Sequence, residues 1–434
     1  MNQRVLIKYL KIDENNVISG FVDTIRDKKN ICFIVVRDIS GKLQLTIDKT
    51  KNTSLNEILS KITNESVIKA TGKVIKSDFV KLNNQEMIVD NIEILSIAKP
   101  SPIIAPKGSE TNIDLRLDYR WLDLRSEKNT LIFKVQTELQ KSFRNYLLNN
   151  NFIEIHTPKI INTESESGAG VFELNYFDKK AYLAQSPQFY KQMAMAAGFE
   201  RIFETGPVFR AEKSNSKKHT TEFSGFDIEM SYIDSFYNIM DLEEDLIINA
   251  LKNVKEKYEE EIMSLYNTDV VIPQKPFPVI SLTELYDELE KRYNYKANDY
   301  EKGDLTTAGE KLCEKLAKDK YNSEFLFVIG YSAENRAFYH MRDKNGTPCG
   351  YDLIWKGIEI TTGAQREHRY EILVKQAEEK NLKDDVKDYL KFFEYGCPPH
   401  GGFGLGIDRL TMVLLNLGIK ESMFIFRGPD RLTP

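Results

Sequence analysis

The sequence predicts an α+β protein of two domains, a small N-terminal β-barrel and a larger domain built on an antiparallel β-sheet with flanking helices. Short β-rich runs crowd into residues 17–97, whereas strand-like and helical segments alternate after residue 129. Between these patterns, residues 98–108 contain three prolines, which disfavour a continuous helix or strand. We therefore expect one domain over residues 1–98, a linker or hinge over 99–128 and a second domain over 129–434.

The N-terminal runs fit a small Greek-key barrel of the OB type. A helical segment, residues 54–62, interrupts the β-rich pattern, as it does in barrels of this kind. A β domain without a ligand is the alternative interpretation of the same pattern. The five strands are expected at residues 17–25, 31–37, 43–47, 66–75 and 86–95.

The larger domain is expected to begin with an amphipathic helix. Apolar residues recur every three or four positions from Ile132 to Leu147, and three asparagines at 149–151 end the pattern. A strand follows at residues 152–156. Further strands are expected at residues 181–184, 201–209, 223–232, 325–330 and 350–362, and further helices at 188–197, 241–257, 370–380 and 410–415.

Composition indicates a cytoplasmic protein with reduced thiols and no membrane partner. The chain has 434 residues, 41% apolar and 29% charged, and its longest apolar runs are far shorter than the roughly 18–20 residues of a membrane-spanning helix. No charged-then-apolar leader opens the sequence. The four cysteines form no Cys-x-x-Cys pair, and the five histidines lack the spacing of zinc ligands. These patterns argue against a structural metal.

Charge is unevenly distributed along the chain. The net charge is −5, but the first 100 residues carry a balance of +4 and the remainder a balance of −9. A polyanion is therefore expected to prefer the N-terminal part.

A first cluster of chemically active residues lies on two strand-like runs joined by a polar loop, residues 213–219. Arg210 can pair a phosphate bidentately, loop donors can reach the far end of a polyphosphate, and Phe223 offers a flat face to a base. Asp227 and Glu229 are two residues apart on a strand and so share a face. A surface hairpin would show similar charges.

A second cluster contains Asp352, Glu359 and Arg366. The two carboxylates come from one strand-like region, and such oxygens together with substrate phosphates are the ligands that Mg²⁺ prefers. Solvated strand charges are the alternative.

A third cluster is the glycine-rich segment 396–406, which precedes Arg409 and a helix. The glycine spacing matches neither G-x-G-x-x-G nor a Walker sequence, so Rossmann and P-loop folds are rejected. The segment favours a tight backbone that feeds a helix, where a nucleotide can approach closely and Arg409 supplies a cation.

Together these segments resemble the class II aminoacyl-tRNA synthetases, and the resemblance runs along nearly the whole chain. Residues 152–158, Phe-Ile-Glu-Ile-His-Thr-Pro, resemble motif 1 of that family; residues 209–229 resemble motif 2; residues 402–410, Gly-Phe-Gly-Leu-Gly-Ile-Asp-Arg-Leu, resemble motif 3. The His-Ile-Gly-His-type sequence of class I enzymes is absent. The resemblance implies an OB-fold anticodon-binding domain followed by a class II catalytic domain.

Within that family the chain is similar to the aspartyl-tRNA synthetases of the short archaeal type. Residues 183–192, Leu-Ala-Gln-Ser-Pro-Gln-Phe-Tyr-Lys-Gln, are similar to a segment typical of them. The resemblance continues through residues 163–172, which correspond to the loop over the amino-acid pocket, and through the hinge at residues 116–125. Two departures stand out, Ser167 where glycine is common and a displaced proline and aspartate in residues 425–434.

The resemblance implies a role for each matching residue. Arg210 and Arg409 would be catalytic, with Arg210 on the α-phosphate of ATP. The other ATP-binding residues would be Glu212, His219, Phe223 and Glu359, with Phe223 and Arg409 around adenine. Lys191 and Arg366 would bind the substrate side-chain carboxylate, and Glu166, Gln188 and Asp227 its ammonium end. Asp352, Glu359 and Thr362 would hold Mg²⁺, and Phe33, Gln44, Arg26 and Glu86 would bind the anticodon.

The function expected from this resemblance is ligation of L-aspartate to the tRNA for aspartate, with ATP and Mg²⁺, by a homodimer. Whether tRNA for asparagine is also charged stays open. The alternatives are asparaginyl specificity, a specialised synthetase paralogue that binds RNA without charging it, and an adenylate-forming ligase that delivers aspartate elsewhere. The paired cations Lys191 and Arg366 disfavour the first, since an anionic side chain needs cationic partners when it is buried.

Overall fold

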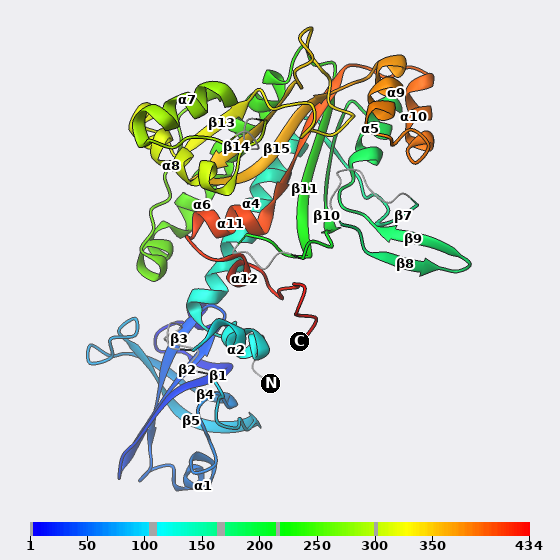
Figure 1. Ribbon diagram of the computed structural model, residues 1–434. Helices are drawn as coiled ribbons and strands as arrows, with labels where there is room; N and C mark the ends of the chain where they lie inside the picture. The colour runs from blue at the N-terminus through cyan, green and yellow to red at the C-terminus, as the bar shows by residue number, and fades with distance from the viewer. Residues whose placement is uncertain (1–2, 104–110, 163–169, 214–217, 299–302) are drawn as a thin grey trace. The chain divides into compact units, whose positions relative to one another are not determined.

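The computed structural model describes residues 3–103, 111–162, 170–213, 218–298 and 303–434 (Figure 1). The chain divides into two compact units, Met1–Thr111 and Asn112–Pro434. Among the described helices, none is long and apolar enough to cross a membrane.

The first unit is a closed barrel with the strand order β1-β2-β3-β5-β4, which confirms the predicted barrel. Its strands are β1 (Asn15–Asp27), β2 (Ile31–Asp38), β3 (Gly41–Asp48), β4 (Val67–Lys76) and β5 (Gln85–Ser96). Alternate side chains, such as Ile34 and Val36 on β2, fill the interior, as the two-residue period of a strand requires. The predicted helix over 54–62 is shorter, a 3₁₀ turn at Thr53–Leu55 followed by α1 (Asn56–Leu59).

The second unit is built on a sheet of eight described strands in the order β12-β13-β14-β15-β16-β11-β10-β6. They are β6 (Ile153–Glu154), β10 (Arg201–Phe209), β11 (Glu222–Ser231), β12 (Val279–Ser281), β13 (Phe325–Ile329), β14 (Gly350–Trp355), β15 (Ile358–Arg366) and β16 (His400–Gly406). The predicted antiparallel sheet is confirmed for the six central strands, while β12 and β6 at the edges pair in parallel with their neighbours.

Three helices pack against one face of this sheet: α4 (Glu127–Asn149), α6 (Tyr237–Tyr266) and α11 (Ile407–Leu414) (Figure 1). The hydroxyl of Ser126 caps α4 by accepting from the Asn129 amide, and the helix buries residues spaced by three or four, as predicted. Phe226 and Ile228 of β11 belong to this core. Asp227 and Glu229 alternate with them and therefore face away from the helices.

Two predicted segments differ from the structure. The run over residues 350–362 is a hairpin of two strands, because Lys356 and Gly357 both have positive φ and turn the chain. The glycine-rich segment, for which no strand was predicted, forms the central strand β16, and the predicted helix follows it directly as α11. A side chain at Gly402 would overlap the backbone oxygen of Ile228 and the carboxylate of Glu229, so the glycines let polar side chains of neighbouring strands meet across β16.

The remaining helices and a small sheet complete the second unit. A separate small sheet has the order β7-β9-β8. These elements are α2 (Ile113–Asp118), α3 (Arg120–Asp123), β7 (Ile160–Ile161), β8 (Glu173–Tyr176), β9 (Lys179–Leu183), α5 (Gln188–Ala196), α7 (Leu282–Tyr293), α8 (Thr307–Tyr321), α9 (Tyr370–Glu379), α10 (Lys387–Glu394) and α12 (Ile419–Ser422). A 3₁₀ turn, Ile7–Tyr9, precedes the barrel strands. The sequence analysis did not predict α7, α8 or α10.

Candidate active site

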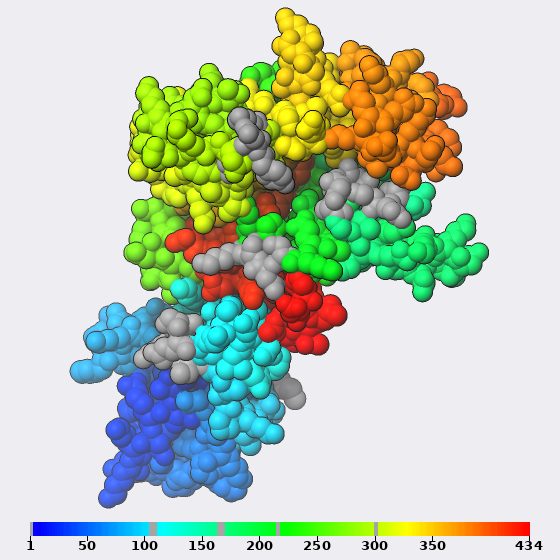
Figure 2. Space-filling model, viewed as in Figure 1, coloured from blue at the N-terminus to red at the C-terminus, as the bar shows by residue number. Residues whose placement is uncertain are grey.

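The polar face of the large sheet borders a cavity of about 640 Å³, a size typical of small-molecule sites. In Figure 2 the surface is hollowed between the yellow-green residues of α7 and α8 and the orange residues of α9 and α10. The predicted site residues that line this cavity are Gln188, Lys191, Arg210, Glu212, His219, Phe223, Asp227, Glu359, Thr362, Arg366 and Arg409. Asp352 lies just behind the lining, and Glu166 falls outside the described residues.

The register of the sheet explains why residues distant in the sequence meet here. Asp227 on β11 pairs with Gly404 on β16, Gly404 pairs with Thr362 on β15, and Thr362 pairs with Asp352 on β14. Paired residues of neighbouring strands point to the same face. This row therefore brings Asp227, Gly404 and Thr362 to the cavity, with Asp352 next to Thr362.

One end of the cavity holds four charged side chains with balanced charge. Lys191 Nζ lies 2.9 Å from Asp227 Oδ1 and 3.3 Å from Glu229 Oε2. Arg366 Nε donates to Glu229 Oε1 at 3.0 Å, and its Nη2 donates to the backbone oxygen of Gly402 at 3.0 Å. Burial alone would raise the pKa of Glu229, but Arg366 and Lys191 lower it below the ordinary value. Glu229 is therefore an ionised anchor for both cations.

A histidine that sequence reasoning missed also contacts this cluster. His340 Nε2 lies 3.4 Å from Arg366 Nη1, and residues 340 and 366 form an isolated β-bridge. Burial, followed by the charges of Arg366 and Arg336, holds the pKa of His340 well below its usual range. The ring is therefore neutral, which allows Nε2 to accept from Arg366.

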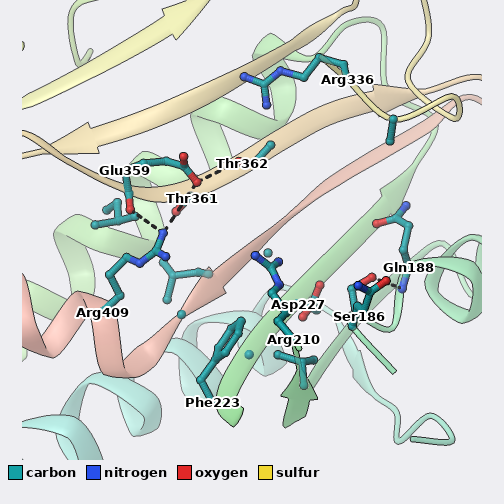
Figure 3. A pocket seen from close by; sticks show the side chains of 18 of the residues that line it. Ser186, Gln188, Arg210, Phe223, Asp227, Arg336, Glu359, Thr361, Thr362 and Arg409 are labelled. Atoms are coloured by element: carbon teal, nitrogen blue, oxygen red, sulfur yellow. Dashed lines mark hydrogen bonds and ion pairs between the residues drawn. The ribbon is translucent and has the colours of Figure 1, made fainter. Parts of the chain in front are cut away.

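The other end of the cavity carries Arg210 and Phe223 on the hairpin of β10 and β11. The guanidinium carbon of Arg210 lies 5.4 Å from the centre of the Phe223 ring (Figure 3). Its Nε is buried and has no hydrogen-bond partner within the described ranges. A buried donor without a partner is costly, so this atom is suited to an anionic ligand oxygen.

Next to it, His219 Nε2 lies 3.9 Å from Glu212 Oε2. Burial lowers the pKa of His219, as do the nearby cations Arg409, Lys218 and Arg210, while Glu212 opposes the shift. Lys218 pairs with both carboxylate oxygens of Glu310 on α8 at 2.7 Å, a contact that the sequence analysis did not anticipate.

Arg409 lies on the far side of the cavity beside Glu359 and Thr362, two of the three predicted metal ligands (Figure 3). Arg409 Nη1 donates to the Glu359 backbone oxygen at 3.0 Å and lies 3.8 Å from its Oε1. The Thr362 hydroxyl lies 2.9 Å from Asp352 Oδ1 and 3.3 Å from Glu359 Oε1. Burial, and then the negative charge of Asp352, raises the pKa of Glu359.

The oxygens of Asp352, Glu359 and Thr362 suit a metal ion whose remaining ligands come from a bound substrate. No group of three or more His, Cys, Asp or Glu side chains suited to a metal occurs among the described residues. Arg336, which the sequence analysis missed, already binds both oxygens of Asp352, at 2.9 and 2.6 Å. Glu359 is the more available carboxylate, with 35% of its side chain exposed. Two carboxylates with phosphate oxygens would suit Mg²⁺.

The four predicted anticodon residues come together on the barrel. Arg26 lies 5.7 Å from the Phe33 ring and donates to Gln44 Oε1 at 2.9 Å, while Gln44 Nε2 donates to Glu86 Oε2 at 3.2 Å. Phe33 is only half-buried and lies outside the core cluster of the barrel. An aromatic ring next to amide and charged groups can stack a base and read its edge.

Arg336 and His340 carried no recognisable signal in the sequence. They lie between β13 and β14 in a stretch without helical or strand periodicity, and only the folded chain brings them to Asp352 and Arg366. A pattern of spacing cannot reveal such contacts.

Comparisons with known proteins agree with this geometry. Residues 112–425 match the family of class II tRNA synthetases (D, K and N), and residues 17–95 match an OB-fold nucleic acid binding domain of the tRNA anticodon type. The chain is 40% identical to the aspartate–tRNA(Asp) ligase of Pyrococcus abyssi, over 96% of this chain and 95% of that protein. It is 38% identical to the aspartate–tRNA(Asp/Asn) ligase of Methanocaldococcus jannaschii, over 96% and 94%.

Solved structures show the same architecture. The asparaginyl-tRNA synthetase of Pyrococcus horikoshii in complex with asparaginyl-adenylate superposes with a TM-score of 0.90 at 30% identity, covering all of both chains. The aspartyl-tRNA synthetase of Entamoeba histolytica superposes with a TM-score of 0.88 at 31% identity, covering all of this chain and 93% of that one. The chain therefore belongs to the class II tRNA synthetases of the aspartate, lysine and asparagine group, and within it to the aspartate–tRNA ligases.

Proposed function

We propose that this ligase condenses L-aspartate with ATP to aspartyl-adenylate in the cavity and then transfers the aspartyl group to the 3′ end of the tRNA for aspartate. One observation carries the proposal. The cations Lys191 and Arg366 and the cations Arg210 and Arg409 line the same cavity, so one space can hold both an anionic amino acid and a polyphosphate.

For the amino acid, we assign Lys191 and Arg366 to the side-chain carboxylate. Arg366 has five N–H donors, and three contacts are made by Glu229, Gly402 and His340, which leaves donors for a substrate carboxylate. Two buried cations favour a carboxylate over the neutral amide of asparagine. Gln188, Asp227 and Glu166 are assigned to the ammonium group.

For ATP, we assign Arg210 to the α-phosphate, His219 and Arg409 to the β- and γ-phosphates, and Phe223, with Glu212 nearby, to the adenine end. In the first step an oxygen of the α-carboxylate of aspartate attacks the α-phosphorus of ATP. The new C–O–P linkage forms, and pyrophosphate leaves. Both reactants are anions, so the protein's task is alignment and charge neutralisation, with no protein nucleophile.

Mg²⁺ would be held by Glu359, Asp352 and Thr362 together with phosphate oxygens. Burial, and then the negative charge of Asp352, raises the pKa of Glu359, and a bound cation would offset both effects, which supports this assignment. When bound, the ion would neutralise phosphate charge.

For tRNA, we assign residues 1–98 to anticodon binding, residues 99–128 to a linker and residues 129–434 to catalysis. A terminal ribose hydroxyl of the tRNA would attack the aspartyl carbonyl of the adenylate, and AMP would leave. Phe33, Gln44, Arg26 and Glu86 would contact the anticodon. The tRNA for asparagine is a second candidate substrate, because relatives of similar identity include both aspartate–tRNA(Asp) and aspartate–tRNA(Asp/Asn) ligases.

We further propose a homodimer located in the cytoplasm. Motif 1 forms the dimer interface in this family, and the edge strand β6 in that motif carries the exposed Ile153, with exposed Leu148 and Phe199 before and after it in the chain. Sedimentation of the purified full chain measures the oligomeric state, and a monomer at micromolar concentration would contradict the proposed homodimer. ATP and tRNA, the proposed substrates, are cytoplasmic.

Two assays test the function. Aspartate-dependent exchange of pyrophosphate into ATP should occur, and asparagine should support it far less. Charging of transcripts of the tRNAs for aspartate and asparagine then defines the acceptor. Exchange without charging of either tRNA would favour a paralogue or a ligase with another acceptor, and exchange with asparagine alone would overturn the proposal.

A further inference from the structure

A buried chain of hydrogen bonds runs from the backbone of residue 398 to the proposed ammonium site. His400 Nδ1 lies 2.8 Å from the Pro398 oxygen, and its Nε2 lies 3.0 Å from the side-chain nitrogen of Gln192. Gln192 Oε1 accepts from Gln188 Nε2 at 2.8 Å and from the Tyr389 hydroxyl at 3.0 Å. All four side chains are buried.

The donor and acceptor of every hydrogen bond in this series follow from the first acceptor, the Pro398 oxygen. The Pro398 oxygen can only accept, so Nδ1 of His400 must carry a proton. A neutral imidazole then accepts at Nε2, and the NH₂ group of Gln192 must face the ring. Gln192 Oε1 consequently faces the opposite way, where it accepts from Gln188 and Tyr389.

His400 is neutral in the folded protein. Burial lowers its pKa to about 4, with help from Arg366 and against the opposing effects of Glu229 and the Pro398 contact. A second proton on the ring would present a donor to the NH₂ group of Gln192 and disrupt the chain. The orientation therefore holds throughout the neutral pH range.

The last member, Gln188, lines the cavity. Because its NH₂ group is engaged by Gln192, its Oε1 is the amide atom available to a ligand. Figure 3 shows the Gln188 side-chain oxygen on the side of the cavity and its nitrogen turned away from it. An ammonium group has three donors and no acceptor, so an amide oxygen suits it and an NH₂ group would repel it.

We propose that Gln192 and His400 are positioning residues for the α-ammonium group of the substrate: they fix the amide of Gln188 so that its oxygen faces the cavity. The inference rests on the proposed function, which places the ammonium group at Gln188. Neither residue would touch the substrate, and the sequence analysis assigned neither of them a role.

The test compares L-aspartate with succinate, which is aspartate without its amino group. In the full-length enzyme, Gln192→Met keeps the side-chain length and removes the amide. We expect the KM for L-aspartate in pyrophosphate exchange to rise about tenfold to a hundredfold, since the affected hydrogen bond is to a charged group. The kcat should change much less, and the inhibition constant of succinate should stay within about twofold, since succinate has no ammonium group for Gln188 to bind.

Three matched variants make the result decisive. His400→Phe removes the acceptor and should act like Gln192→Met, while His400→Gln restores an acceptor and should recover much of the affinity. Tyr389→Phe removes the other donor to Gln192 but leaves its orientation fixed by His400, so its KM should stay near that of the unmodified enzyme. The inference would be overturned if Gln192→Met weakened the binding of aspartate and of succinate equally. It would also be overturned if Tyr389→Phe raised the KM for aspartate as much as Gln192→Met does.

Gln188→Ala separates this inference from the proposed function. If Gln188→Ala raises the KM for aspartate and Gln192→Met does not, the positioning role is wrong and the proposed function stands. If Gln188→Ala leaves the KM unchanged, Gln188 does not bind the ammonium group, and both the assignment and the inference fall.

Discussion

At the residue scale, the proposed amino-acid end of the cavity already has balanced charge in the structure. Lys191, Arg366, Asp227 and Glu229 carry two charges of each sign and form three ion pairs. Lys191 is only 1% exposed, and an unpaired cation at such a site would be strongly destabilising. Glu229 pairs with both cations, and in the proposed function a substrate carboxylate would share them.

Arg366→Leu should cripple aspartate activation, because the substrate carboxylate would lose its bidentate partner and Glu229 would lose an ion pair. We expect a loss of about 3 to 5 kcal/mol in kcat/KM for aspartate, measured by pyrophosphate exchange. Arg369→Leu is the matched control, because Arg369 pairs with Glu367 and does not line the cavity. Near-normal exchange in Arg366→Leu would disprove the assignment of the pocket.

Arg409→Ala should slow adenylate formation by a factor on the order of 100 or more, because a cation is removed from charge that develops in the transition state. Its contact with the backbone oxygen of Glu359 fixes it at the cavity wall. Rapid-quench measurement at saturating ATP tests the prediction, because the defect should persist there. A change confined to the KM for ATP would make Arg409 a binding residue only.

The sequence predicted many of the residues that line this cavity, and the lining residues it missed were missed for a physical reason. Arg210, Asp227, Glu359 and Arg409 lie in segments with recognisable motifs, and the structure places them all on one cavity. His340, like Arg336, lies in a stretch whose conformation is set by tertiary contacts. One example is the Gln376 side chain, which donates to the His340 backbone oxygen at 3.0 Å. Pairings between such distant residues leave no local spacing to detect.

At the element scale, the strand β16 shows how local sequence can mislead. Its glycines gave no indication of a strand, because glycine weakens a strand in isolation. In the sheet they are required by crowding from β11, where Glu229 and Ile228 occupy the space of any side chain at position 402. The helices α7 and α8 pack with β13 and β14 in a separate small core, which includes Leu285 and Leu316. Buried leucines recur at three- and four-residue spacing in α7, so this helix was a local signal that the prediction missed.

The helix α6 carries a buried carboxyl group that should make folding sensitive to pH. Tyr351 on β14 donates its hydroxyl to Glu243 Oε2 at 2.6 Å, and burial raises the pKa of Glu243 from 4.5 to about 8. In the unfolded chain the group ionises near 4.5. Its stabilising contribution is therefore complete below 4.5 and is lost as the pH rises through about 8.

Glu243→Gln should remove this dependence while it keeps an oxygen for the Tyr351 hydroxyl. Relative to the variant, the melting temperature of the unmodified protein should fall between about pH 5 and about pH 9. The fall should be roughly 2–4 °C for each kcal/mol lost from the free energy of unfolding. Scanning calorimetry across that range measures the difference. Glu256→Gln, an exposed change on the same helix, should leave the profile unaltered. Parallel profiles for Glu243→Gln and the unmodified protein would mean that Glu243 is ionised when folded.

At the scale of the whole molecule, the proposed catalytic residues and the proposed anticodon-binding residues lie in different units. All residues that line the cavity belong to Asn112–Pro434, and the cluster of Arg26, Phe33, Gln44 and Glu86 belongs to Met1–Thr111. The barrel strands were predicted to within two residues at each end, because alternation of buried and exposed side chains is a strong local signal. Phe33 lies in an apolar run, residues 31–36, which is also compatible with a core position, and the structure places it outside the barrel core.

Phe33→Ala should therefore separate the two steps of the reaction. Pyrophosphate exchange uses only the cavity and should be intact. Charging of the tRNA for aspartate should weaken by roughly 1 to 3 kcal/mol, the usual worth of a base stacked on an aromatic ring. A tRNA with an altered anticodon should be affected little, because it makes no cognate stack to lose. Exchange, charging and melting are measured on one purified variant.

The neighbouring residue provides the matched control. Ile34 points into the barrel and is completely buried, so Ile34→Ala should leave a cavity that costs about 2–5 kcal/mol of stability and should disturb every tRNA alike. Phe33→Ala should spare the melting temperature of the barrel, because its ring is not part of the core cluster. If Phe33→Ala instead lowers the melting temperature as far as Ile34→Ala does, and its charging defect ignores the anticodon, then Phe33 supports the barrel and does not read the tRNA.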